Sequence, residues 1–179
     1  MDSDELSLAG YASIVAAAAS IPMTIYSMLN GFSSEPSTII KALDLLYMVL
    51  LVFVSIKLID YLSDKDFTDA NNLLWTSIGL SIILYFINMI SPDDGDLLVL
   101  VIPLGVILGV VTILIGIKLK NCPNSLHGYL KTFSNLTIAT GICGASILLL
   151  PFALIFQMVA LVIQGMIFLK EADKVKSVF

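Results

Sequence analysis

The sequence contains no arginine, one histidine, two cysteines and few charged residues of any kind. Charged residues make up 13% of its 179 residues and hydrophobic residues 58%, whereas soluble domains have about 25% and roughly 45–50%. The mean hydropathy is +1.00. This shortage of charge excludes an ordinary soluble domain and indicates a membrane protein with no separate soluble part.

The other absences exclude several classes of function. Arginine is the side chain best suited to bind phosphate through two hydrogen bonds, so we expect no nucleic acid partner. Two cysteines, Cys122 in a polar stretch and Cys143 in an apolar one, are too few for a disulfide framework. With only His127 and no HExxH motif or phosphate-binding loop, the sequence offers no catalytic set, and we expect no enzyme.

Metal and cofactor sites are not expected either. Cys122 and His127 share one connection, but a structural zinc site takes four ligands. Asp93, Asp94 and Asp96 crowd a predicted turn that is much shorter than a twelve-residue calcium loop. We interpret this turn as solvated.

Intervals without charge locate the membrane spans, because a span needs about 20 mostly apolar residues. Three intervals predict spans at about 6–29, 71–90 and 97–117. The span at about 37–61 has to include charge, since only 45–56 is free of it. The interval from Lys131 to Lys170 would make one helix of roughly 58 Å, so we predict two spans, 131–149 and 152–169, with a break near Pro151.

The lysines give the topology, because cytoplasmic connections are enriched in positive charge. All nine basic residues are lysines, and all but Lys41 follow every second apolar segment. We therefore predict an all-α polytopic membrane protein with six transmembrane helices in three hairpins, a single domain over 1–179, and both termini in the cytoplasm. A five-span alternative would place Lys170, Lys174 and Lys176 outside, against this bias.

Polar side chains inside predicted spans are the candidate functional residues, because they are costly in lipid. Asp44 is the strongest, with Lys41 one turn earlier as its expected partner and Ser55 farther along the same helix. Gln157 and Gln164 are seven residues apart and share a face of the last span. Each has a structural alternative: a local ion pair near the interface for Asp44, and hydrogen bonds between helices for the glutamines.

Small residues recur at a spacing of four, which lets helices in membranes approach closely. They are Gly105 and Gly109, Gly141 and Ala145, and Ala12, Ala16 and Ser20. We expect them to pack helices within the chain, with self-association as the alternative.

Two functions remain open. The leading hypothesis is a non-enzymatic accessory protein in the bilayer, a subunit, assembly partner or inhibitor that contacts other membrane chains. The alternative is a small transporter or channel with a polar path around Lys41, Asp44, Gln157 and Gln164.

Overall fold

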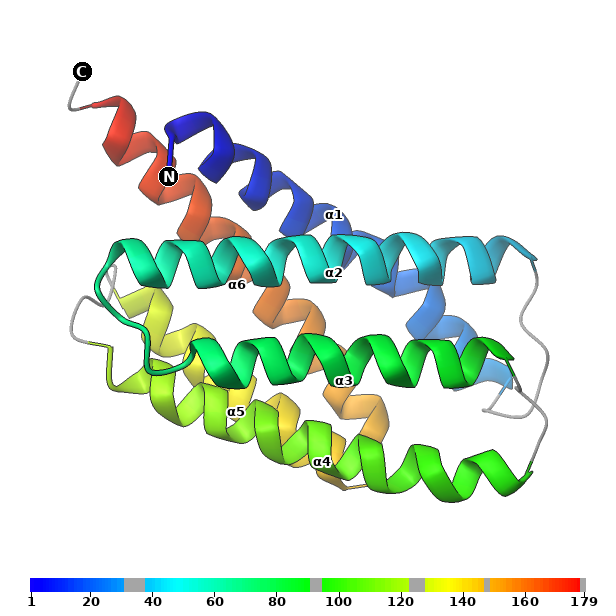
Figure 1. Ribbon diagram of the computed structural model, residues 1–179. Helices are drawn as coiled ribbons and strands as arrows, with labels where there is room; N and C mark the ends of the chain where they lie inside the picture. The colour runs from blue at the N-terminus through cyan, green and yellow to red at the C-terminus, as the bar shows by residue number, and fades with distance from the viewer. Residues whose placement is uncertain (31–37, 91–94, 123–127, 147–148, 178–179) are drawn as a thin grey trace.

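The computed structural model describes residues 1–30, 38–90, 95–122, 128–146 and 149–177 (Figure 1). Within these ranges the chain forms six α-helices and no strand, as predicted. The helices are α1 (Ser3–Asn30), α2 (Thr38–Asp64), α3 (Asn71–Ile90), α4 (Gly95–Lys120), α5 (Tyr129–Ala145) and α6 (Leu150–Lys176).

Five of these helices, all except α5, are long and apolar enough to cross a membrane. The protein is therefore an integral, multi-pass membrane protein. The predicted span 71–90 coincides with α3, and α1, α2 and α4 differ from the predicted spans 6–29, 37–61 and 97–117 by one to three residues at each end. α6 begins two residues before the predicted span 152–169 and ends seven residues after it. Pro22 and Pro103 lie inside α1 and α4, which continue through them.

The fifth predicted span, 131–149, does not match the structure. α5 has 17 residues, which corresponds to about 25 Å against a hydrocarbon core of about 30 Å. α5 ends at Ala145, four residues before the predicted end, and the next residue, Ser146, has extended backbone angles. Pro151 lies in the first turn of α6, where its missing N–H is not needed. Pro151 thus begins a helix and does not end one.

The helices form a ring in chain order. Each helix packs against the next, and α6 packs against α1 and closes the ring. The closest pairs are α4 with α5 and α1 with α6, and the loosest neighbours are α2 and α3. The N-terminus of α1 and the C-termini of α2, α4 and α6 meet at one end, here called the lysine-rich end (Figure 1).

Glycines explain the close contact between α4 and α5. A Cβ atom added to Gly109 would lie 2.6 Å from the backbone nitrogen of Ala145, and one added to Gly141 would lie 2.6 Å from the carbonyl oxygen of Gly109. About two turns after Gly109 on α4, a Cβ on Gly116 would lie 2.9 Å from the Ser134 carbonyl oxygen. The two backbones therefore touch, which only glycine permits at these positions.

α1 and α6 also pack closely through small residues. A Cβ on Gly165 would lie 2.9 Å from the carbonyl oxygen of Gly10. The fully buried Ser13 hydroxyl donates a hydrogen bond of 2.7 Å to the Leu161 carbonyl oxygen. Small residues and a buried hydroxyl thus join α1 and α6, which are more than a hundred residues apart in the sequence.

The hairpin of α5 and α6 does not reach the far end of the bundle. Ala145, the last residue of α5, packs against Gly109, and α4 continues outward from there to Gly95, about 21 Å at 1.5 Å per residue. Figure 1 shows the ends of α5 and α6 well short of the outer ends of α2, α3 and α4. Non-helical backbone at such depth is tolerated where it is buried in protein or lines a cavity.

Candidate functional site

A cavity of about 370 Å³ lies between α2, α3, α4, α5 and α6. Its size falls within the range of about 300–1,000 Å³ typical of small-molecule sites. Its wall includes Gly144 and Leu150, which flank the break between α5 and α6. The helix ends on either side of this break therefore border the cavity, which is one of the settings in which non-helical backbone is tolerated in a bilayer.

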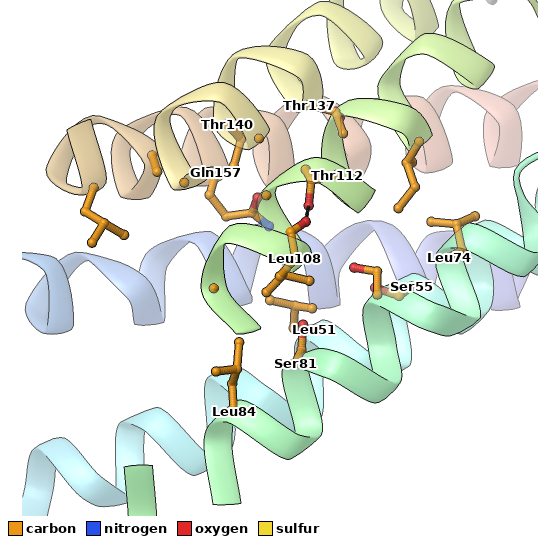
Figure 2. A pocket seen from close by; sticks show the side chains of 18 of the residues that line it. Leu51, Ser55, Leu74, Ser81, Leu84, Leu108, Thr112, Thr137, Thr140 and Gln157 are labelled. Carbon is orange, nitrogen blue, oxygen red and sulfur yellow. Dashed lines mark hydrogen bonds between the residues drawn. The ribbon is translucent and has the colours of Figure 1, made fainter. Parts of the chain in front are cut away.

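Among the described residues, the wall of the cavity carries eight polar side chains and no charged one. Figure 2 shows Thr140 and Gln157 on one side of the cavity and Ser55 and Ser81 on the other. Leucines complete the wall on several sides. The polar side chains are Tyr47, Ser55, Ser77, Ser81, Thr112, Thr137, Thr140 and Gln157.

These hydroxyl groups differ in what they already bind. The hydroxyls of Thr112 and Thr137 each donate a hydrogen bond of 2.8 Å to a carbonyl oxygen one turn earlier on the same helix. The Thr140 hydroxyl is buried and has no hydrogen-bond partner among the described residues. An unpaired buried hydroxyl is costly, so a rotation of the Thr140 side chain toward a hydrogen-bonding molecule in the cavity would be favourable.

Two of the predicted site residues, Ser55 and Gln157, lie in this wall. The Gln157 side chain interacts with the Tyr47 hydroxyl, which links α6 to α2 across the cavity. Asp44 lies one turn before Tyr47, is half-buried, and acts electrostatically on both Tyr47 and Tyr85. Asp44 is thus next to the cavity without lining it.

The other two predicted site residues lie elsewhere. Lys41 is exposed, and the described residues include no ion pair between Lys41 and Asp44. Gln164 is buried, and its Nε2 donates to the Val54 carbonyl oxygen at 3.5 Å. Gln164 therefore joins α6 to α2 as an interhelical hydrogen bond, apart from the cavity.

The small residues predicted to pack helices divide into two groups. Gly109, Gly141 and Ala145 lie at the contact of α4 and α5, and both glycines also border the cavity. Gly105 lines the cavity as well, but no atom lies within 4 Å of a Cβ added to it. On α1, Ala12 packs against the main core and Ala16 is fully buried against Leu161. Ser20 is buried and donates a hydrogen bond to the Ala17 carbonyl oxygen.

Sequence reasoning missed the serines and threonines of α3 and α5. Ser77 and Ser81 are four residues apart, and Thr137, Thr140 and Gly144 follow the same helical spacing. The signal was present as polar stripes on two apolar helices. Single hydroxyls are common in spans, so only the arrangement of the helices showed that both stripes face the same space.

A second group of residues lies at the lysine-rich end of the ring and is here called the inner cluster: Tyr61, Lys65, Phe168, Glu171 and Lys174. Lys65 pairs with the buried Glu171, and Lys174 Nζ lies 3.7 Å from the other oxygen of Glu171. The Lys65 ammonium lies 5.7 Å from the centre of the Tyr61 ring, which meets Phe168 edge to face at 6.0 Å. This cluster ties α2 and its following connection to α6.

Asp93, Asp94 and His127 lie outside the described residues. Among the residues that are described, no group of three or more His, Cys, Asp or Glu side chains is placed to hold a metal ion. No family model matches the chain, and no curated protein or solved structure matches it.

Proposed function

We propose that this protein is a small transporter or channel that carries a solute through the cavity inside its ring of helices. The observation that carries the proposal is the set of uncharged polar side chains, including the unpaired Thr140 hydroxyl, gathered from five helices around one space. Polar groups in membrane-spanning helices that face a shared cavity are typical of substrate pathways. Packing alone does not require so many hydroxyls in one place.

The proposed pathway has unequal ends. We propose that α5 and α6 form a hairpin that enters from the cytoplasm, reaches partway across the bilayer and returns, with both termini cytoplasmic. The outer half of the ring then consists mainly of α1 to α4. We propose that the inner cluster closes this pathway at its cytoplasmic end.

The direct test is solute flux in proteoliposomes that contain the full chain. The panel consists of erythritol, threonate and choline, followed by light scattering after an osmotic step. Gly105→Phe is the blocking variant, because Gly105 faces open space in the cavity and a phenyl ring there fills part of it. We expect flux of at least one solute above empty liposomes and near-complete loss in Gly105→Phe at unchanged thermal stability. Absence of flux for the whole panel would contradict transport.

Asp44→Asn should lower the flux of the transported solute severalfold and leave the abundance of the protein nearly unchanged. The reason is that the Asp44 charge acts on Tyr47, which lines the cavity, while no ion pair of the described residues depends on it. Flux and membrane abundance are measured together. Asp69→Asn, at an exposed position in the connection before α3, is the matched control. If Asp44→Asn lowers abundance and flux in equal proportion, Asp44 is structural.

The accessory function is the second candidate, and the exposure of α2 and α3 favours it. Within their most apolar windows only 6% of α2 and 11% of α3 are buried inside the chain, against 39% for α1 and α6. Such faces contact either lipid or other membrane chains, including a second copy. Crosslinking from Trp75, which is exposed on α3, in native membranes separates the two: a discrete protein adduct supports an assembly role, and lipid adducts alone count against it.

A further inference from the structure

We infer that the cavity binds a small neutral solute with several hydroxyl groups, of the polyol class. This inference rests on the proposed transport function and names the substrate class of the same site. It starts from the wall of the cavity, where every polar side chain of the described residues is a hydroxyl or an amide. A charged solute would lose its hydration there without contacting an opposite charge among the described lining residues, since Asp44 lies beside the cavity and does not line it.

The helix ends near the cavity do not favour an ion either. α5 ends beside Gly144 and α6 begins beside Leu150, and both residues line the cavity. The C-terminal end of a helix carries partial negative charge and the N-terminal end partial positive charge. Because the two ends are adjacent, their effects oppose each other and select neither sign.

The hydrogen-bonding groups fit a solute that both donates and accepts. The Thr112 and Thr137 hydroxyl protons already bind carbonyl oxygens of their own helices, so these two oxygens face a ligand as acceptors. The Thr140 hydroxyl has no partner among the described residues, and the Gln157 amide offers both a donor and an acceptor. A molecule with hydroxyl groups on several carbons matches this mixture.

The volume of the cavity and the apolar part of its wall also fit a small polyol. A volume of about 370 Å³ corresponds to roughly a dozen water molecules at about 30 Å³ each, which is ample for a four-carbon polyol. Leu51, Leu84 and Leu108 lie between the polar groups of the wall. They contact the carbon atoms of such a solute while its hydroxyls bind the serines and threonines.

Erythritol and threonate form the decisive pair, because they have the same number of carbon atoms and differ by one carboxylate. In proteoliposomes we expect erythritol to enter severalfold faster than into empty liposomes, with threonate and choline at background. Thr140→Val keeps the shape of the side chain and removes the hydroxyl, and should slow erythritol about fivefold, the usual value of one hydrogen bond. Thr24→Val, at a buried α1 position outside the cavity, should change nothing.

The outcomes separate the two proposals. If threonate or choline moves faster than erythritol and Gly105→Phe blocks it, transport stands and the polyol class is wrong. If nothing moves, both are wrong. Binding is checked apart from flux with Ser81→Cys in a Cys122→Ser, Cys143→Ala background: erythritol should protect the introduced thiol from alkylation, and equal protection by threonate would overturn the inference.

Discussion

Gly109→Ala is expected to destabilise the protein strongly, while Gly105→Ala, one turn away on the same helix, is not. The new methyl group at Gly109 would lie 2.6 Å from the Ala145 backbone nitrogen and 2.9 Å from its Cα, so α4 and α5 have to separate. Overpacking of this kind costs about 1–3 kcal/mol. At Gly105 the methyl group meets no atom within 4 Å, and exchange of glycine for alanine in a helix contributes roughly 0.5–1 kcal/mol of stability.

The measurement is thermal unfolding of the purified variants in detergent, with abundance in membranes as a second readout. Gly141→Ala tests the same contact from the side of α5, because its added methyl group would lie 2.6 Å from the Gly109 carbonyl oxygen. The double variant should cost less than the sum of the two single ones, since the first separation of the helices relieves the second. Equal destabilisation by Gly105→Ala and Gly109→Ala would mean that α4 and α5 are not in this contact.

The second large effect is expected in the inner cluster, where Lys65→Met should destabilise the protein more than Glu171→Gln. The Glu171 side chain is 9% exposed and that of Lys65 is 35% exposed. Removal of Lys65 leaves a buried carboxylate whose remaining nearby cation, Lys174, is 3.7 Å away and half exposed. Removal of the Glu171 charge leaves Lys65 free to turn toward water.

Removal of one partner of a fully buried pair costs about 3–5 kcal/mol, and the partial exposure of Lys65 reduces this to about 1–3 kcal/mol for Lys65→Met. We expect less than about 1 kcal/mol for Glu171→Gln, because a partly exposed lysine can turn toward water and be solvated. Thermal unfolding gives the order of the two variants. A larger loss of stability in Glu171→Gln than in Lys65→Met would show that Lys65, and not Glu171, is the charge that needs its partner to stay buried.

The same variants report on closure of the lysine-rich end. Cys122 is buried there at the end of α4 and lies close enough to Tyr61 to affect it electrostatically. If the inner cluster holds this end closed, Lys65→Met in a Cys143→Ala background should speed alkylation of Cys122 at temperatures well below unfolding. An unchanged rate would assign the cluster to stability alone.

Charge-free intervals located most of the helices, because each charged residue is expensive in lipid and marks where a span has to stop. α3 coincides with its predicted range, and α1, α2 and α4 differ from theirs by a few residues at the ends. The method failed at α5 because no charge occurs between Lys131 and Lys170. There the helix ends were decided by local backbone geometry, which apolar composition does not encode.

The candidate site was predictable only in part. Ser55 and Gln157 were recognised as polar residues in spans, and both line the cavity, but their partners Ser77, Ser81 and Thr140 were not recognised. The spacing of three residues predicts a contact between Lys41 and Asp44, but this spacing permits a contact and does not require one. Glu171 gave no signal, because its burial depends on Lys65, more than a hundred residues away.

The sequence by itself determined that this chain is a helical membrane protein. Its apolar intervals are long enough to cross a bilayer, and it has too few charged residues to cover them in water. Only the tertiary structure decided which polar residues share one cavity, why Gly109 packs while Gly105 faces open space, and how far the α5 and α6 hairpin extends. These features depend on which helices are neighbours and on their relative depth. Backbone contacts between glycines and hydrogen bonds across helices fix that arrangement, and neither can be read from a single segment.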